Sequence, residues 1–314
     1  MEATIQLPKT QMEAIQYFAN PDNCHDFMVS LRWPTGIKCP LCGSDKIGKL
    51  VRPRRVWNCK GCKKQFSAKV RTIFEDSPLG LEKWLTAVWL IVNAKNGISS
   101  YELHRSIGVT QKSAWFMLQR IRLAMQEGSF EKFSGRVEAD ETYIGAKARF
   151  MHKNKRTGKT GMVGKTAVLG LLERDADGKG SRVRCKIMNR VRVSDLDPEV
   201  RANVESGSEV ITDALSSYYK LADDYTHKVI DHAVSYAEGH VHTNCLENFW
   251  SLLKRLIKGT YVSVEPFHLF RYLDEQAYRF NERKGTDSER FVRAFRNVAN
   301  RRITYKNLTG KAAA

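Results

Sequence analysis

The sequence predicts a multidomain α+β protein with a zinc ribbon, a helix-turn-helix, and a mixed sheet flanked by helices. Two Cys-x-x-Cys pairs lie near the N-terminus, and apolar residues at helical spacing dominate residues 81–125. From residue 136 onward, strand-like runs alternate with helical ones. We therefore expect three domains, at residues 1–75, 76–130 and 131–314.

The charge of the chain indicates a nucleic-acid partner. Its 314 residues carry a formal charge of +18, while a hydrophobic content of 42% is ordinary for a folded protein. A membrane surface and a merely basic protein are the alternatives. No apolar run approaches the about 20 residues of a membrane span, and the N-terminus lacks the basic-then-apolar order of a secretory signal. We expect a cytoplasmic, nucleoid-associated protein without a membrane partner.

The first domain is expected to fold around zinc. A short helix over residues 10–20 precedes a basic, Gly-rich segment with little apolar mass. Within it, residues 43–58 separate two Cys-x-x-Cys pairs, a spacing typical of one tetrahedral zinc site, whereas redox dithiols fit two matched pairs poorly. Trp57 and Phe66 would form the apolar cover. The predicted ligands are Cys39, Cys42, Cys59 and Cys62.

The second domain has the spacing of a helix-turn-helix. Helices are expected at Ser100–Ser106 and Thr110–Met125, with Gly108 in the turn and Thr110 as the cap of the second helix. A plain helical hairpin is the alternative. Residues of the second helix would face DNA, with Arg120 or Arg122 on the phosphate backbone. The predicted groove residues are Gln111, Lys112 and Ser113.

The third domain alternates strands and helices. The expected strands are Arg136–Ile144, Thr166–Leu172, Arg182–Met188, Glu209–Thr212 and Thr226–Ile230. The expected helices are Ser194–Ser206, Leu215–Leu221, Pro266–Asn281 and Ser288–Arg301. Three strands followed by alternating helices and strands predict a mixed sheet with helices on its faces.

A basic segment follows the first of these strands. Residues 147–165 hold seven Lys or Arg and no acid, with three glycines. Such a loop could clamp DNA, or it could be an ordinary surface loop. The predicted DNA contacts in it are Lys153, Lys155 and Arg156.

The most informative stretch is residues 242–258, which reads as a helix. Leu246, Phe249, Trp250, Leu253, Leu256 and Ile257 share one face, while Glu247, Ser251, Lys254 and Lys258 share the opposite one. A carboxylate followed by lysines along a stripe can hold a metal and then phosphates, although a solvated face is a common alternative. His242 and Asn244 precede the stripe and could cap the helix or orient a ligand.

Two aspartates each end an apolar strand-like run, and together with Glu247 they predict a divalent-metal site. Glu138 and Asp140 share one face of the first strand, and Asp213 ends the run that begins at Val210. Two ions about 4 Å apart can activate an attacking oxygen and stabilise a leaving one where acidic ligands converge. Asp140 would bridge both ions, with Asp213 and Glu247 each holding one.

These motifs resemble those of bacterial insertion-sequence transposases of the DDE class. The closest group has an N-terminal zinc ribbon and is related to the eukaryotic Merlin elements, and the likeness covers nearly the whole chain. The blocks that carry it are Arg32-Trp-Pro-x-Gly-x-x-Cys39-Pro-x-Cys42-Gly, Val137-Glu-Ala-Asp-Glu-Thr-Tyr-Ile-Gly, Thr212-Asp213, His242-Thr-Asn-x-x-Glu247-x-x-Trp250-x-x-x-Lys254-Arg, and Arg279-Phe-Asn-x-Arg283.

The resemblance implies a ribonuclease-H-like fold and a DNA strand-transfer enzyme dependent on Mg²⁺ or Mn²⁺. Asp140, Asp213 and Glu247 become the catalytic triad, with Lys254 as an accessory residue. Some members of the group place Asn or His at the third acidic position, so Asn244 is the alternative to Glu247. We favour Glu247, because a carboxylate neutralises a dication and an amide does not.

The sequence therefore predicts a transposase that acts on double-stranded DNA by two-metal phosphoryl transfer. Handling two element ends implies a homodimer or larger assembly on DNA. Two rival functions stay open: a non-catalytic DNA-binding regulator, and a metal-dependent nuclease without strand transfer.

Overall fold

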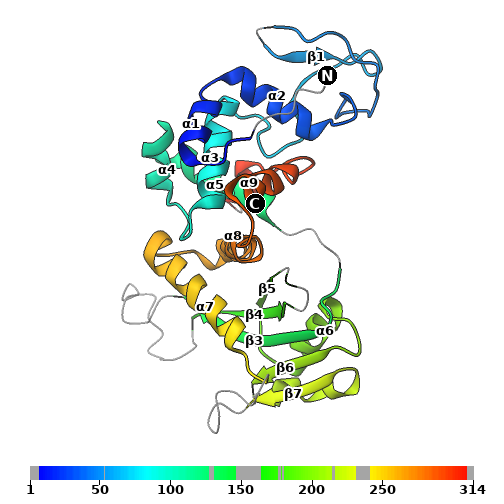
Figure 1. The fold of residues 1–314 in the computed structure, drawn as a ribbon, viewed down its shortest axis with the longest axis vertical. Coiled ribbons are helices and arrows are strands. Elements are labelled where there is room, and N and C mark those ends of the chain that lie inside the picture. Colours follow the sequence, from blue (N-terminus) through cyan, green and yellow to red (C-terminus); the bar gives the residue numbers. More distant parts are fainter. Residues whose placement is uncertain are drawn as a thin grey trace. The chain divides into compact units, whose positions relative to one another are not determined.

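The computed structural model describes residues 7–52, 54–126, 131–145, 164–175, 178, 180–213, 216–230 and 241–309. The chain divides into two compact units, one made of residues 1–126 with 285–314 and the other of residues 127–284. Figure 1 labels the helices and strands of both units. The predicted DNA contacts Lys153, Lys155 and Arg156 lie outside the described residues.

The N-terminal part of the first unit combines two helices with a small sheet. Its elements are α1 (Gln11–Phe18), α2 (Pro21–Arg32), β1 (Val56–Asn58) and β2 (Gln65–Ser67). The strands pair antiparallel, with Trp57 opposite Phe66. A single short helix is predicted over residues 10–20, but a second helix, α2, follows it. Pro21 begins α2 at a first-turn position where no backbone N–H is needed.

The rest of this unit is helical. Its helices are α3 (Leu81–Asn93), α4 (Ser100–Ile107), α5 (Gln111–Met125), α9 (Asp287–Arg296) and α10 (Tyr305–Leu308). A capping box of Ser99 and Glu102 begins α4, and Gly108 ends it at a φ of 63°. The hydroxyl of Thr110 accepts the N–H of Ser113 and caps α5. Local capping therefore sets these helix ends within a residue or so of the expected positions.

Aromatic packing joins the C-terminal residues to this unit. The ring of Phe291 lies 5.3 Å from that of Phe18 and 5.5 Å from that of Trp89. Phe295 packs against Phe74 at 5.7 Å between ring centroids. The predicted third domain, residues 131–314, is thus divided, and residues 285–314 cluster with the N-terminal unit. An amphipathic pattern shows that a helix needs a core, but it does not show which core covers it.

The second unit is built on a five-stranded mixed sheet with the order β5-β4-β3-β6-β7. The strands are β3 (Arg136–Ile144), β4 (Thr166–Glu173), β5 (Arg182–Met188), β6 (Glu209–Asp213) and β7 (Thr226–Ile230). Neighbours pair antiparallel from β5 to β3 and parallel from β3 to β7. The expected mixed sheet with flanking helices is confirmed.

Helices cover both faces of this sheet. Helix α6 (Val193–Asn203) and the 3₁₀ helix η3 (Ser216–Asp223) pack on the face of Val137 and Ala139. Helices α7 (Asn244–Leu256) and α8 (Leu269–Asn281) pack on the opposite face, which carries Val168 and Leu172. The six apolar residues predicted for one side of this helix are all buried, five of them in α7 and Ile257 directly after it, which confirms the predicted amphipathic pattern.

The approach of α7 to the sheet depends on a glycine. A Cβ added to Gly170 of β4 would lie 2.5 Å from the indole of Trp250 and 2.9 Å from Leu246. Gly170 pairs with Asp140 on β3. The missing side chain therefore lets α7 lie directly over the strand position that carries the first predicted catalytic carboxylate.

Several helix types differ from the expectation. Residues Ser216–Asp223 form a 3₁₀ helix, α7 continues into a π-helical turn at Ile257–Tyr261 (η4), and a 3₁₀ turn at Pro266–His268 (η5) precedes α8. Apolar spacing alone does not separate these helix types. Within the described ranges, no helix combines the length and apolarity required to cross a bilayer.

Candidate active site and zinc centre

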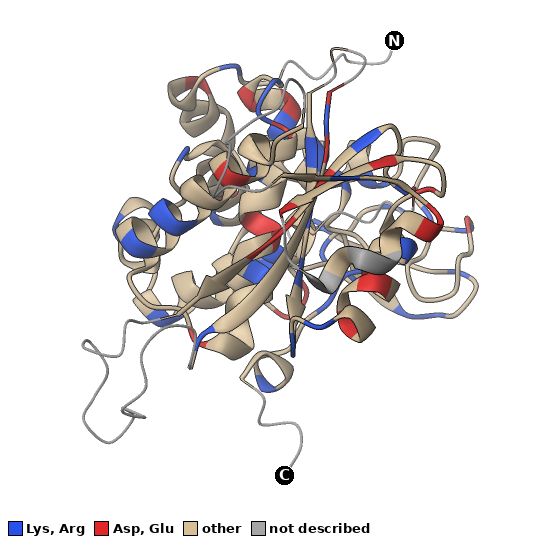
Figure 2. Ribbon diagram, turned by 90° about the horizontal axis from the view of Figure 1, so that it is seen from below, with Lys and Arg blue, Asp and Glu red and all other residues tan. Residues whose placement is uncertain are grey.

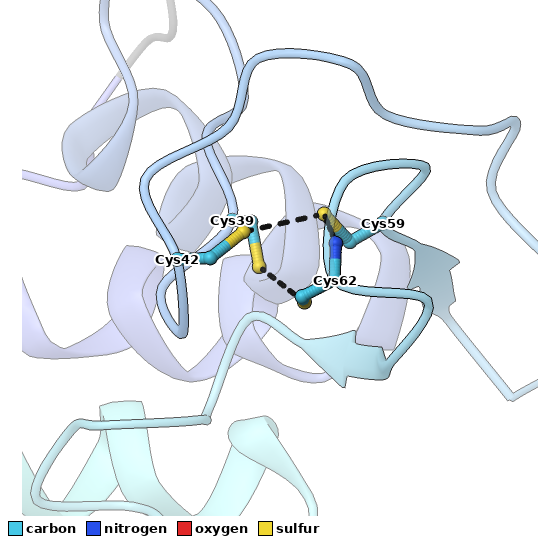
Figure 3. A group of neighbouring side chains, drawn as sticks. All are labelled: Cys39, Cys42, Cys59 and Cys62. Atoms are coloured by element: carbon cyan, nitrogen blue, oxygen red, sulfur yellow. Dashed lines mark hydrogen bonds between the residues drawn. The ribbon is translucent and has the colours of Figure 1, made fainter.

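Four cysteine sulfurs converge in the first unit (Figure 3). The Sγ atoms of Cys39 and Cys62 are 3.8 Å apart, and those of Cys42 and Cys59 are 3.6 Å apart. All four lie within 4.8 Å of one another. Four thiolates about 2.3 Å from a central zinc ion would be separated by about 3.8 Å. The spacing of the sulfurs therefore fits a structural zinc ion with no open coordination position.

The surroundings of the cysteines support this assignment. The backbone N–H of Cys62 donates to Sγ of Cys59 at 3.4 Å and lowers the pKa of that thiol to about 6. Trp57 and Phe66 stack at 5.7 Å between ring centroids and are buried, as expected for the apolar cover of the ribbon. Cys24 and His25 are buried in α2 and do not belong to this cluster, and Sγ of Cys24 donates to the carbonyl oxygen of Phe18 at 3.3 Å.

In the second unit, β3 and β6 bring two aspartates to neighbouring positions. The parallel register runs from Arg136 opposite Glu209 to Ala139 opposite Thr212. The next residue on each strand is Asp140 and Asp213. Residues at matched positions of parallel neighbours project from the same face of a sheet. Both carboxylates thus lie on the face that α7 covers, and Asp140 shares that face with Glu138, as predicted.

The helix α7 supplies the third carboxylate. Glu247 lies in its first turn and is exposed, and its Oε1 accepts from the hydroxyl of Thr243 at 3.2 Å. Lys254 and Lys258 follow on the same exposed side. Asn244, the alternative third ligand, is also exposed and is the first residue of α7.

Electrostatic coupling links the three carboxylates. Burial raises the pKa of Asp140 to about 6, and the charges of Asp213 and Glu247 contribute in the same direction. The indole Nε1 of Trp250 opposes this shift by donating to Oδ2 of Asp140 at 2.9 Å. A bound dication would relieve this repulsion, so the donor set fits a divalent metal.

A compact metal-ligand group is nevertheless found elsewhere in this unit. Among the described residues, Glu138, His242 and Cys245 have ligand atoms within 4.8 Å of one another, and the triad of Asp140, Asp213 and Glu247 does not form such a group. Two ions spread over a shared site need ligands that are farther apart than those of a single ion. The triad therefore stays a prediction that the strand register and the pKa of Asp140 support.

Two partners in this region were not predicted. The sequence marks Trp250 as a core residue and as part of a family motif but gives it no role toward Asp140, yet its indole donates to Asp140. Glu141, next to Asp140, accepts a hydrogen bond from Tyr218 of η3. Burial raises the pKa of Glu141 to about 7, with Asp140 and Asp213 adding to the effect. No local pattern marks either pair, because each joins residues distant in the sequence.

The predicted DNA-binding residues of α5 differ in their exposure. Lys112 is exposed, with its Nζ 5.3 Å from the ring centroid of Tyr305. Gln111 is half-buried and donates to Ser100 Oγ at 2.8 Å, while the half-buried Ser113 takes part in the cap of α5. Of these three, Lys112 is the one that a ligand can reach most freely.

The expectation for Arg120 is corrected by the structure. Its side chain is 5% exposed, its Nη1 donates to the carbonyl of Glu75 at 2.9 Å, and its guanidinium lies 4.4 Å from the ring of Phe116. Arg120 therefore stabilises the helical core of the first unit. Helical spacing alone does not show that the outer side of α5 is also covered.

A basic groove beside the turn between α4 and α5 was not predicted. Its lining includes Lys83, His104, Arg105, Thr110 and Ser113. Lys83 comes from α3, for which no DNA contact was predicted. Figure 2 shows that Lys and Arg recur along many elements of the chain, so the charge of +18 is not confined to one segment.

Comparison with known proteins finds two family models that match this chain. The family model described as an ISXO2-like transposase domain matches residues 132–281. The model described as a transposase zinc-ribbon domain matches residues 19–65. The first match contains β3, β6 and α7, and the second contains the four cysteines.

A curated relative points the same way. The chain is 25% identical over 262 residues to an uncharacterized protein in transposable element ISH50 of Halobacterium salinarum, covering 78% of this chain and 85% of that protein. The two family matches, the cysteine cluster and the carboxylate-bearing strands identify the chain as a member of the insertion-sequence transposases of the DDE class that carry an N-terminal zinc ribbon.

Proposed function

We propose that this transposase cuts the ends of its own element and transfers the freed 3′-hydroxyl ends to target DNA. The observation that carries the proposal is the neighbouring placement of Asp140 and Asp213 at matched strand positions, under a helix that bears Glu247. Three acidic groups from separate elements are the arrangement that phosphoryl transfer with divalent metals requires.

Two Mg²⁺ or Mn²⁺ ions, when bound, would supply activation of the attacking oxygen and neutralisation of the leaving one. Asp140, Asp213 and Glu247 would hold them, with Asp140 shared. Oxygen ligands suit both metals, so the donor set does not select between them. The indole of Trp250 donates to Oδ2 of Asp140, and this bond would hold the carboxylate in place for metal binding.

The exposed lysines of α7 and of the turn η4 that continues it would hold the DNA backbone. Lys254 lies two helical turns beyond Glu247, and Lys258 follows one turn later. At these positions the ammonium groups can neutralise phosphates on either side of the reacting bond. Lys254 is expected to act at the site, and Lys258 along the flanking DNA.

The first unit would recognise the element ends. We assign Lys112 and the basic groove with Lys83 and Arg105 to contacts with double-stranded DNA. The zinc ribbon would extend that surface. Two ends must be handled together, so we expect a dimer or a larger assembly on DNA.

The test is an in vitro reaction on a duplex that carries both ends of the element that encodes this chain. With Mg²⁺ or Mn²⁺, the protein should nick the labelled ends and join the 3′ strand covalently to a second duplex. Asp140→Ala and Asp213→Ala should abolish both steps and retain DNA binding. Glu199→Ala, which removes a surface carboxylate paired with Lys186 in the same unit, is the matched control and should stay active.

The rival functions give different results in the same assay. Cleavage without joining would leave a metal-dependent nuclease. Binding without cleavage at any metal concentration would leave a DNA-binding regulator. Full activity of Asp140→Ala or Asp213→Ala would overturn the assigned triad while keeping the enzyme class.

A further inference from the structure

Glu138 is a fully buried carboxylate two residues before Asp140. Its exposed fraction is 0%, and it lies on the sheet face that α7 covers. Oε2 accepts the backbone N–H of Leu246 at 2.8 Å, and Oε1 accepts Nε of Arg174 at 2.7 Å. Both oxygens therefore have a partner, and one of those partners belongs to the first turn of α7.

Arg174 extends this contact to the segment that precedes α7. Its Nη2 donates to the carbonyl oxygen of His242 at 2.5 Å and lies 2.9 Å from Nδ1 of the same residue. Nδ1 of His242 is also 3.7 Å from Oε1 of Glu138. One guanidinium thus joins β3, the end of β4 and the start of α7, a geometry that the planar fork of arginine permits.

The start of α7 depends on this group for capping. Among the described residues, the N-cap Thr243 makes no side-chain capping hydrogen bond to the first turn. Glu138 instead accepts from the third residue of the helix and places its negative charge at the positive end of the helix dipole. The cap is supplied by a strand, so it fixes the helix relative to the sheet as well as satisfying the N–H.

Glu138, His242 and Cys245 are close enough to suggest a second zinc site. The position of Arg174 argues against one. Its guanidinium donates to Glu138 and lies 2.9 Å from Nδ1 of His242, so a cation already occupies the space between these two residues and would repel a metal ion.

We propose that Glu138, Arg174 and His242 are positioning residues that lock the first turn of α7 against β3 and thereby hold Glu247 at the metal site beside Asp140. This inference rests on the proposed function. Glu247 lies one residue after Leu246, whose N–H is bound by Glu138, so any rotation of the first turn moves the carboxylate directly. Partners behind metal ligands commonly change metal affinity by about 10–100-fold when removed.

The experiment uses the full-length protein and Glu138→Gln, which keeps the shape and one acceptor but removes the charge. Mn²⁺ affinity is measured by titration calorimetry, and backbone protection by hydrogen–deuterium exchange. We expect the Mn²⁺ dissociation constant to rise by about 10–100-fold. We also expect protection to fall at residues 244–248 while the sheet keeps its protection.

The control is Glu275→Gln, which removes another fully buried carboxylate, paired with Arg279 within α8. It should lower the thermal midpoint by a similar amount but leave Mn²⁺ affinity and residues 244–248 unchanged. If Glu138 only stabilised the fold, both variants would lower the thermal midpoint and neither would change the Mn²⁺ affinity or the protection of residues 244–248 selectively. Arg174→Lys should restore part of the Mn²⁺ affinity lost in Arg174→Gln, because a single ammonium replaces only some of the bonds of the fork.

Wild-type Mn²⁺ affinity together with unchanged protection at residues 244–248 in Glu138→Gln would overturn the proposal. A second zinc ion per wild-type chain that is lost in Glu138→Gln would also overturn it, since the group would then be a metal site. If the wild-type protein neither binds Mn²⁺ nor cuts DNA, the proposed function fails. Selective loss of protection at residues 244–248 would still support the positioning role in that case.

Discussion

The indole of Trp250 donates a hydrogen bond to Asp140, with 2.9 Å between Nε1 and Oδ2. The same indole packs over Gly170, which pairs with Asp140 across the sheet. A helix that would otherwise only cover the sheet is therefore tied to the first carboxylate of the candidate site. The distance between α7 and the sheet and the ionisation of Asp140 depend on the same side chain.

Replacing Trp250 by phenylalanine should separate these two roles. Phenylalanine keeps an aromatic ring over Gly170 but donates nothing, so the pKa of Asp140 should rise above its present value of about 6. The acidic limb of the pH–rate profile for DNA cleavage should move to higher pH. An unchanged limb, with only a lower thermal midpoint, would mean that the hydrogen bond does not control Asp140.

The ionised carboxylate of Asp140 should lower the free energy of unfolding of the metal-free protein at neutral pH. Its pKa of about 6 in the folded chain exceeds its ordinary value of 3.8, so the folded state binds its proton more readily than the unfolded state. Stability should then fall as pH rises from about 4 to about 6 and stay low above that range. Asp140→Asn should gain about 1–3 kcal/mol at pH 8 without divalent metal, and nothing at pH 4. Urea unfolding at the two pH values measures the difference.

The gain at pH 8 should also shrink when Mg²⁺ is added. A dication that binds the folded wild type and not the unfolded chain stabilises only the wild type. An Asn variant that is no more stable than wild type at pH 8 would contradict the burial of a charged carboxylate at this position.

Gly170→Ala should displace α7. Its Cβ would lie 2.5 Å from the indole of Trp250, a distance that requires the helix or the strand to shift. We expect a loss of about 1–3 kcal/mol in unfolding free energy and a larger relative loss of cleavage. Gly259→Ala is the control, because an added Cβ there meets nothing within 4 Å. Equal stability of the two variants would refute the close approach of α7.

Removing zinc should unfold the ribbon and spare the second unit. The strands β1 and β2 have three residues each, so metal binding must supply much of the folding free energy of this segment. Wild-type protein should contain one zinc ion per chain by elemental analysis, and Cys59→Ser none. Hydrogen exchange should then speed up at residues 39–67 and stay unchanged in β3 and β4. Cys185→Ser, outside the cluster, should keep its zinc.

Arg120 and Lys112 should differ in what their loss changes. Arg120→Ala removes a buried guanidinium and leaves the carbonyl of Glu75 without that donor, which should cost about 1–3 kcal/mol of stability. Lys112→Ala should change stability by less than about 0.5 kcal/mol but weaken DNA binding and lower its salt slope by about 1. If Arg120→Ala were as stable as the wild type and its DNA binding depended less on salt, Arg120 would instead be a DNA contact.

The sequence alone predicts the features of this protein that depend on neighbouring residues. The zinc ligands follow from the spacing of the cysteines, the ends of α4 and α5 from their caps, and the ends of β3, β5 and β7 from alternation and turn residues. Each of these patterns operates within a few residues, where geometry leaves few choices. The three candidate carboxylates are predicted because each follows an apolar run or begins a polar stripe on a helix, and their role at a metal site stays a prediction.

The tertiary structure alone decided how these pieces are joined. The bond from Trp250 to Asp140, the cap that Glu138 gives to α7, and the burial of Arg120 all link residues that are far apart in the chain. The packing of α9 on the N-terminal core is of the same kind. An apolar face or a charged side chain shows that a partner is needed, but only the folded chain selects which partner is within reach.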